Sequence, residues 1–195
     1  ATSSPSVTVV SERWPPVYDA EDLARTIQEM GERGDLEARF YEAPSSASGS
    51  YCQGDIFSFT SPVPLVDEDG QALAEGEVAT WMLLTNSCDF NRTLDDVTWA
   101  QMVPVDNLGK RSSLTTNELA ALRRYSQSRR FYVPPWAQST DPDICCADFT
   151  RPVTIHRSAL AHGEVVARLS LHGWVLLHAC LVRFLARDDG RYDVG

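Results

Sequence analysis

The sequence predicts an α+β fold, in which a small, partly open β-barrel is packed by three helices. Short runs of strand-forming residues, separated by polar segments with Pro and Gly, recur between residues 51 and 157. Helical patterns of apolar residues occur before, within and after this region, at about 20–33, from Thr115 onward and at about 169–186. With 195 residues, 43% of them hydrophobic, the chain can bury the core of one such domain.

Residues 1–50 are predicted to form an extension, in which a strand and a helix precede a linker. The helix covers about residues 20–33, and Asp19 can cap its first turn. Its apolar residues recur at i, i+4 and i+7, namely Leu23, Ile27 and Met30. A short strand at 36–41 leads to the Ser- and Ala-rich segment 43–50, a composition typical of linkers. We expect the helix to dock on its own domain, with docking on a partner chain as the alternative.

The centre of the predicted barrel combines three strands with one polar turn. A strand at 56–59 precedes the segment 60–78, which is rich in Pro, Gly and carboxylates and predicts a long loop. The nearly continuous apolar run Val78–Leu84 is typical of a strand buried on both faces. It leads directly into the polar cluster TNSCDFN at 85–91, and a further strand follows at 97–105. Strand ends of this kind often present functional groups.

The C-terminal half begins with a helix, because Thr115 and Glu118 have the spacing of a capping box. The elements predicted after it are a strand at 131–133, a loop at 136–150, a strand at 152–156, a connector at 158–166 and a helix at about 169–186. Residues 51–195 would thus form the barrel with an inserted and a C-terminal helix, and together with the extension one compact domain.

Composition narrows the classes of function. The net charge of −10 disfavours overall attraction to nucleic acid, because phosphate binding depends on Lys and Arg. Only Lys110 is a lysine, and all other basic residues are arginine, which indicates GC-rich bacterial codon usage. No apolar run approaches the roughly 20 residues that span a bilayer, and no secretory signal is visible. The five cysteines match no disulfide framework, so we expect a cytoplasmic protein without membrane contact.

Candidates for chemistry are few, and each has a structural alternative. Cys88 and Asp89 could act as nucleophile and base or as ligands, and Asp55 could lie nearby as a further carboxylate. Alternatively, Cys88 packs as a small apolar residue, while Asp89 and Asn91 hold a turn through the backbone. No paired CxxC, HExxH, GxSxG or GxGxxG motif is present, so we expect no metal and no cofactor.

One basic and aromatic group stands out near the middle helix. Its members are Arg123, Arg124, Arg129 and Arg130, followed by Phe131 and Tyr132. Such a group could contact phosphates while the aromatic rings stack on bases. Alternatively, the arginines are a solvated helix end that complements the helix dipole.

The central 55 residues resemble the MazF/PemK toxin family. The similarity rests on Gly54-Asp55-Ile56, the apolar strand, the turn with Phe90-Asn91-Arg92 and the strand ending in Val103-Pro104-Val105. It implies an SH3-like barrel, a homodimer and metal-independent cleavage of single-stranded RNA. The family has Arg-Pro at the start of the apolar strand and a Ser or Thr after the second strand. This chain has Ala79-Thr80 and Asp106 at those positions. More broadly, the chain resembles uncharacterised bacterial proteins of barrel-plus-helix type.

These observations predict a non-catalytic bacterial binding or regulatory module of a toxin–antitoxin or phage-defence system. The residues expected to bind are Asn86, Asp89, Asn91, Arg92, Arg129 and Arg130. The expected partner is a protein or a second copy of the chain, with nucleic acid as a possibility through the arginine group. The alternative is a hydrolase resembling the RNA-cleaving toxins, which would use Asp55, Cys88, Asp89 and Arg130, since cleavage needs a positive group at the phosphorane.

Overall fold

The structure is a computed structural model, and it describes residues 25, 28–29, 39–43, 51–59, 65–66, 72–73, 80–87, 89, 99–108, 114–136 and 144–185. Of the predicted N-terminal helix, only Arg25, Gln28 and Glu29 are described, and all three are helical and exposed. Several predictions lie outside the described residues, namely the apolar stripe of that helix, the linker beyond residue 43, Cys88, Asn91 and Arg92.

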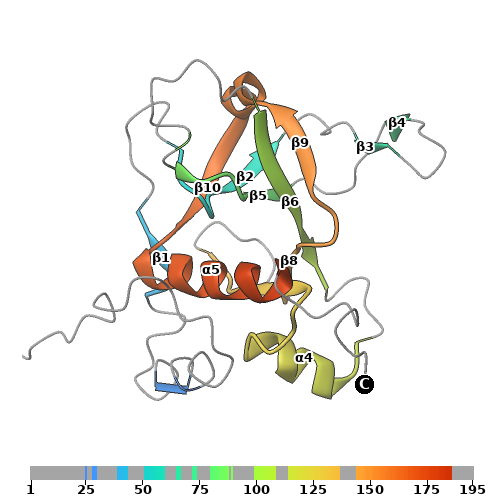
Figure 1. Ribbon diagram of the computed structural model, residues 1–195, viewed down its shortest axis with the longest axis vertical. Coiled ribbons are helices and arrows are strands. Elements are labelled where there is room, and N and C mark those ends of the chain that lie inside the picture. Colours follow the sequence, from blue (N-terminus) through green and yellow to red (C-terminus); the bar gives the residue numbers. More distant parts are fainter. Residues whose placement is uncertain are drawn as a thin grey trace, which may run out of the picture.

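The described strands form a mixed α+β fold around an eight-stranded antiparallel sheet (Figure 1). The order across the sheet is β1 (Tyr41–Glu42), β10 (Gly163–Leu169), β2 (Ile56–Phe59), β5 (Thr80–Leu83), β6 (Trp99–Asn107), β8 (Cys145–Asp148) and β7 (Arg130–Val133). The eighth strand, β9 (Val153–His156), pairs with β6 beside this path. A separate ribbon pairs β3 (Leu65–Val66) with β4 (Ala72–Leu73) inside the segment predicted as a loop.

The long strand β6 organises the sheet. One of its edges pairs with β5, whereas its other edge is shared by β9 along the first half and β8 along the second. The two ends of the sheet also approach each other, because the Tyr41 hydroxyl donates to the Pro134 carbonyl and the Phe40 and Phe131 rings stack 6.0 Å apart. The sheet is therefore curled into a half-barrel.

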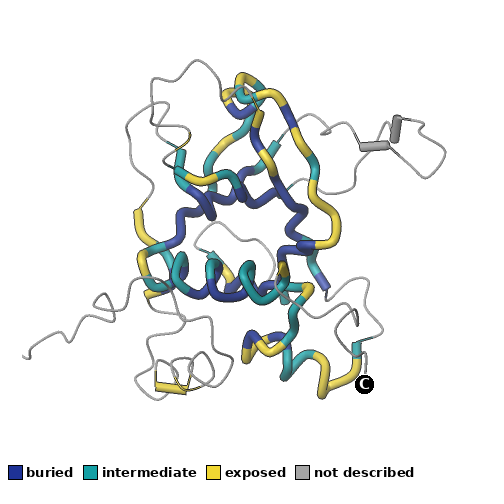
Figure 2. The backbone as a smooth tube through the Cα atoms, viewed as in Figure 1, coloured by how far each residue is buried: buried dark blue, intermediate teal, exposed yellow. Residues whose placement is uncertain are grey.

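Both faces of this sheet are buried, and alternate residues serve two cores. One core gathers side chains such as Phe57, Trp81, Met102, Ile155 and Leu160. The residues that alternate with them, such as Ile56, Met82 and Val103, belong to the larger core beneath α5 (Leu171–Leu185). Figure 2 shows the buried backbone running through the central strands and along α5.

The start of each of the two main helices can be explained from neighbouring residues. Helix α4 (Thr116–Arg123) confirms the predicted capping box: the Thr115 backbone N–H donates to Glu118 Oε2 at 2.8 Å, and the Glu118 N–H donates to Thr115 Oγ1 at 3.3 Å. Helix α5 starts two residues later than predicted, since Leu169 still belongs to β10. A 3₁₀ helix, η2 (Arg157–His162), joins β9 to β10.

Two predictions for the C-terminal half were wrong. The segment 136–150, predicted as a loop, contains strand β8. All four residues of β8 are buried, so it shows no alternation of polar and apolar side chains. The segment 158–166, predicted as a connector, contains η2 and the start of β10. The apolar pattern of β10 is interrupted by Arg168, and the pairing of β10 with β2 shifts register between Val165 and Ala167.

The chain enters β2 through a tight turn at Cys52–Asp55. The Asp55 N–H donates to the Cys52 carbonyl at 3.0 Å, and the Gly54 N–H donates to the Leu83 carbonyl at 2.7 Å. Gly54 has a φ of +89°, in the region that residues with a Cβ rarely adopt. A Cβ at this position would lie 2.5 Å from Leu169 Cδ1. Both backbone conformation and packing therefore require glycine here.

We predict that Gly54→Ala lowers the free energy of unfolding by about 2 kcal/mol or more, since strain in the left-handed region adds to the clash with Leu169. Chemical denaturation measures this change. Asn117→Ala, at an exposed position of α4, is the matched control and should change stability by less than about 0.5 kcal/mol. Equal stability of Gly54→Ala and wild type would contradict this account of the turn.

Candidate functional site

Two polar turns that are far apart in the sequence meet at one end of the barrel. The Gln53 N–H donates to Ser87 Oγ at 2.8 Å, and its side-chain amide donates to the Leu84 carbonyl at 2.7 Å. These bonds place the Cys52–Asp55 turn against Thr85–Asp89, the polar cluster predicted as a binding surface. We call these two segments the turn pair. The structure thus places the turn that contains Asp55 beside the polar cluster, near which the sequence analysis had placed this carboxylate as a candidate.

Asp55 lies beneath this surface in a buried ion pair with Arg168. Arg168 Nε donates to Asp55 Oδ1 at 2.8 Å and Nη2 donates to Oδ2 at 2.7 Å, a two-pronged geometry. Asp55 Oδ2 also accepts from the Cys52 N–H at 2.8 Å. The exposed fractions are 0% for Asp55 and 5% for Arg168. The hydrogen bonds to Asp55 raise the pKa of Arg168, so the guanidinium stays charged although it is buried.

Gln53 connects the turn pair to α5. Its side-chain oxygen accepts from Trp174 Nε1 at 3.1 Å and from His178 Nε2 at 2.6 Å. The Trp174 and His178 rings lie 4.2 Å apart. Burial lowers the pKa of His178, so the neutral ring with its proton on Nε2 fits these contacts. Gln53 is itself buried, and its amide is bonded at both ends.

The outer surface of the turn pair includes residues of Thr85–Asp89 that the contacts of Gln53 hold in place. Asn86 and Asp89 are exposed, and the Asp89 N–H donates to the Asn86 carbonyl at 3.0 Å. Thr85 Oγ1 accepts from the Gln101 N–H at 2.7 Å, which joins the turn to β6. Asp55 and Asp89, predicted as neighbouring site carboxylates, therefore occupy different environments, one buried against an arginine and one at the surface.

Burial keeps three of the described thiols in their protonated form. Cys52 is partly exposed beside the turn pair, where burial raises the pKa of its thiol although the nearby Arg168 opposes this. Burial raises the pKa of both Cys146 and Cys180 to about 12. Thiolates are the nucleophilic form of cysteine. Within the described ranges, no group of three His, Cys, Asp or Glu side chains is placed to hold a metal ion.

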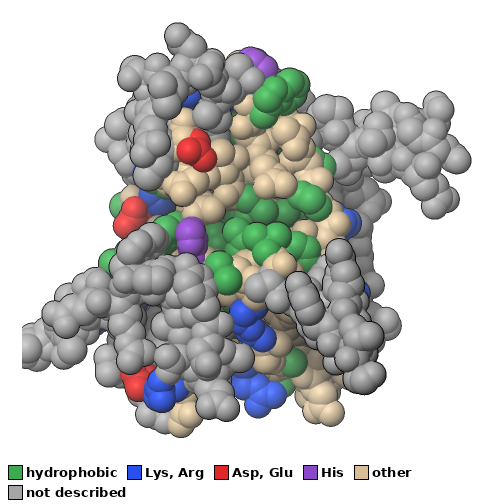
Figure 3. All heavy atoms as spheres, viewed as in Figure 1, with side chains coloured by type: hydrophobic (Ala, Val, Ile, Leu, Met, Phe, Trp, Pro, Cys, Tyr) green, Lys and Arg blue, Asp and Glu red, His purple; other side chains and the backbone are tan. Residues whose placement is uncertain are grey.

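The four arginines predicted as one group lie in different environments in the structure. Arg123 at the end of α4 and Arg124, which caps that end, are exposed and line a shallow cavity of about 420 Å³, whose other lining residues are Thr116, Leu119, Ala120 and Ile144. Arg129 is exposed, whereas Arg130 is half-buried in β7 opposite Asp148 of β8. Figure 3 shows basic side chains in the lower part of the face on view. Within the described part of the chain, no hydrogen bond or ion pair joins these arginines to the turn pair, and we treat them as a separate surface.

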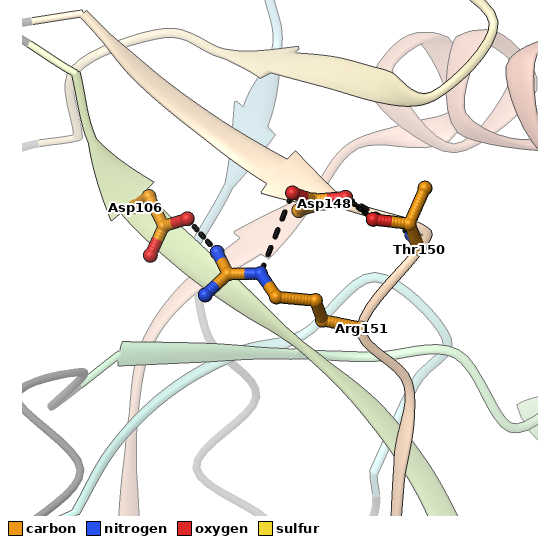
Figure 4. A network of polar contacts seen from close by, with 4 residues as sticks. All are labelled: Asp106, Asp148, Thr150 and Arg151. Atoms are coloured by element: carbon orange, nitrogen blue, oxygen red, sulfur yellow. Dashed lines mark hydrogen bonds and ion pairs between the residues drawn. The ribbon is translucent and has the colours of Figure 1, made fainter. Parts of the chain in front are cut away.

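A second polar cluster stabilises the corner between β8 and β9 (Figure 4). Asp148 Oδ1 accepts from the Thr150 N–H at 3.0 Å and from the Thr150 hydroxyl at 2.6 Å. Arg151 lies between Asp148, 3.4 Å away, and Asp106 of β6, with which it forms an ion pair. The cluster holds the chain against β6 as it passes from one strand to the next. Asp106 is thus engaged by Arg151.

Sequence reasoning missed four of the residues that build this site, namely Gln53, Arg168, Trp174 and His178. One signal was available for Arg168: it is a charged residue between apolar neighbours in VVARLSL, and a buried arginine requires a carboxylate partner. The pairing of Gln53 with α5 joins residues 125 positions apart in the chain. No local pattern encodes a contact of this kind.

No protein-family model matches this chain, and no curated protein sequence matches it. In the part of the chain that the structure describes, no helix has the length and apolar character needed to cross a bilayer. We therefore infer a function from the geometry of the turn pair and its surroundings.

We predict that Asp55→Ala destabilises the fold by about 3–5 kcal/mol, because it leaves Arg168 buried without its counter-ion. Replacing both partners with apolar residues, Asp55→Leu with Arg168→Met, should restore most of that loss. Unfolding free energies from denaturant titration of the single and double variants measure both effects. A loss below about 1 kcal/mol for Asp55→Ala would show that the pair contributes little.

The pKa of His178 predicts a pH dependence of stability. Because this pKa is lower in the folded state than in the unfolded chain, unfolding takes up a proton at acidic pH. The contribution of neutral His178 is therefore fully present above its unfolded pKa and is lost as the pH falls through and below that value. Between about pH 7.5 and pH 5, wild type should lose more stability than His178→Gln. Parallel losses in both proteins would contradict this expectation.

Proposed function

We propose that the chain is a non-catalytic binding or regulatory module built on an SH3-like barrel. The barrel description is supported by the strand order β10-β2-β5-β6-β9, an antiparallel path whose last two strands in the chain are joined by η2. The turn pair, at the start of β2 and the end of β5, is the proposed binding surface. Bacterial toxin–antitoxin or phage-defence systems, and a cytoplasmic location, are the proposed setting; the resemblance and the cysteine usage support them.

One observation favours a binding function over a catalytic one. The carboxylate of Asp55 has no exposed surface, and its two oxygens already accept from Arg168 and from the Cys52 backbone. A catalytic base must come within hydrogen-bond reach of its substrate. Arg168 is likewise occupied, so its charge is not available to a developing phosphorane. Asp55 and Arg168 therefore act in this proposal as supports of the surface above them.

That surface is suited to recognition because it is exposed and firmly held. Asn86 offers an amide and Asp89 a carboxylate, while Ser87 and Thr85 beneath them are bonded to Gln53 and Gln101. Side chains presented on a rigid support lose little conformational entropy on binding. A carboxylate beside an amide favours a partner that donates hydrogen bonds, such as a protein with exposed backbone N–H groups or basic side chains. Asn91 and Arg92 remain proposed members of this surface.

The alternative is a metal-independent endoribonuclease-like hydrolase, with Cys88, Asp89 and Arg130 as the reacting groups. Asp89 is exposed as this alternative requires. However, Arg130 is half-buried in β7, where its position pairs with that of Asp148 in β8. Arg129 is exposed and could contact phosphate, yet the net charge of −10 opposes the approach of RNA. We therefore propose nucleic acid only as a secondary partner, which would bind the arginines at the end of α4 and at the start of β7.

Two measurements test the proposal, one of RNA cleavage and one of partner binding. Incubated with a doubly labelled single-stranded RNA of random sequence, wild type should produce no fragments. Cleavage by wild type that Asp89→Ala abolishes, with an unchanged melting temperature, would establish the hydrolase instead.

For binding, we predict that a partner captured from bacterial lysate by wild type is lost by Asn86→Ala/Asp89→Ala. The control variant Asn117→Ala, at an exposed site on α4, should retain it. Quantitative mass spectrometry of the captured proteins measures the loss, which should be at least about tenfold for two central contacts. Equal capture by the double variant and the control would exclude the turn pair as the binding surface.

A further inference from the structure

The shallow cavity beside α4 joins an apolar floor to two exposed arginines. Its volume is about 420 Å³. Leu119 and Ala120 of α4, together with Ile144 just before β8, provide the apolar floor, and all three are half-buried. Arg123 and Arg124 lie one helical turn further along the same side of the helix, so their charges flank the floor at one end.

Contacts outside the cavity fix the position of its walls. Leu122, on another side of α4, has no exposed surface. Just beyond the end of this helix, the Tyr125 carbonyl accepts from Arg183 Nη1 of α5 at 2.9 Å. The Leu108 N–H donates to the Ile144 carbonyl at 2.8 Å, which holds the chain entering β8 against the end of β6. The cavity is therefore preformed, and little conformational entropy is lost when it is filled.

The two arginines carry charge that the described part of the chain does not balance. No hydrogen bond or ion pair joins their guanidinium groups to another described residue. Glu118, the one acidic residue of α4, does not line the cavity, and its Oε2 accepts from both the N–H and the hydroxyl of Thr115 at 2.8 Å. Two cations beside an apolar floor favour an occupant with carboxylates next to an apolar side chain.

The same arginines are named above as a secondary contact for nucleic acid, but the cavity fits an acidic protein segment better. Single-stranded nucleic acid stacks its bases on aromatic rings. Phe131 and Tyr132, predicted to stack in this way, are buried with exposed fractions of 0% and 7%, and none of the lining residues is aromatic. The net charge of −10 also opposes a long polyanion, whereas a short segment responds mainly to charges within the screening length of about 8 Å.

We infer that this cavity binds an acidic segment of a partner protein, which places an apolar side chain on the floor and flanking carboxylates on Arg123 and Arg124. Sites for small molecules enclose most of their ligand, whereas this cavity is shallow and suits one side chain of a larger partner. All of its lining residues lie outside the turn pair and outside the segment 51–105. The inference therefore does not rest on the function proposed for the turn pair, whose exposed Asp89 favours the opposite charge.

Fluorescence anisotropy with a labelled peptide tests this inference on the full chain. The probe is a fluorescein-labelled decapeptide in which each of two leucines is flanked by glutamates. We expect wild type to bind it with a dissociation constant on the order of 100 μM, and the same peptide with glutamine for glutamate to bind about tenfold more weakly. Arg123→Gln/Arg124→Gln should weaken binding of the glutamate peptide by a similar factor. Arg25→Gln/Arg39→Gln, at two other exposed arginines, is the control of equal charge and should bind as wild type does.

Ala120→Leu tests the apolar floor without any change of charge. The larger side chain would fill part of the cavity, so affinity for the glutamate peptide should fall about fivefold or more. Leucine favours a helix nearly as well as alanine does, so the melting temperature should stay close to that of wild type. Asn86→Ala/Asp89→Ala should still bind the peptide, so failure of this inference and failure of the turn pair as a binding surface can be told apart.

Equal affinity of wild type for the glutamate and glutamine peptides, or no anisotropy change up to about 500 μM protein, would overturn the inference. A labelled decauridylate that binds wild type more tightly than the peptide, and binds Ala120→Leu equally well, would make nucleic acid the occupant instead. Peptide binding that appears only in Asp188→Asn/Asp189→Asn would assign the cavity to the acidic residues of this chain that follow α5, and would exclude a partner as its occupant.

Discussion

The buried ion pair between Asp55 and Arg168 is the interaction on which the rest of the structure depends. It joins the turn before β2 to strand β10 across 113 positions of sequence, and it has almost no contact with water. A buried charge is tolerated only when its partner and its hydrogen bonds are in place. The pair therefore requires the Cys52 N–H, the left-handed Gly54 and the register of β10 against β2 to be correct at once.

The same ion pair also explains which residues of the turn pair lie at the surface. Once Asp55 is fixed, Gln53 reaches the end of β5 on one side and α5 on the other. This leaves Asn86 and Asp89 at the surface and sets α5 with its buried side toward the larger core. Polar residues that suggested chemistry in the sequence thus support the surface that we propose for binding.

The sequence predicted the elements that carry a clear local signal. The apolar run before the TNSCDFN turn became β5, the capping box at Thr115 opened α4, and Pro134 follows the end of β7. Strands β8 and β10 were missed, since complete burial in one and a buried Arg168 in the other remove the alternation that identifies a strand. The candidate site was located only in part: its exposed residues follow a strand end, whereas the partners of Asp55 and Gln53 come from distant segments.

The most direct test of the central role of this ion pair is hydrogen exchange at the Arg168 side chain, followed by NMR of ¹⁵N-labelled protein. Exposed Arg129 provides the internal reference. If the pair with Asp55 is the buried clamp of the fold, the Arg168 Nε–H exchanges only through global unfolding, and its protection equals that of the core amides of β5. If Arg168 Nε–H exchanges as fast as that of Arg129, the pair opens freely in the native state and cannot be the constraint that holds the turn pair.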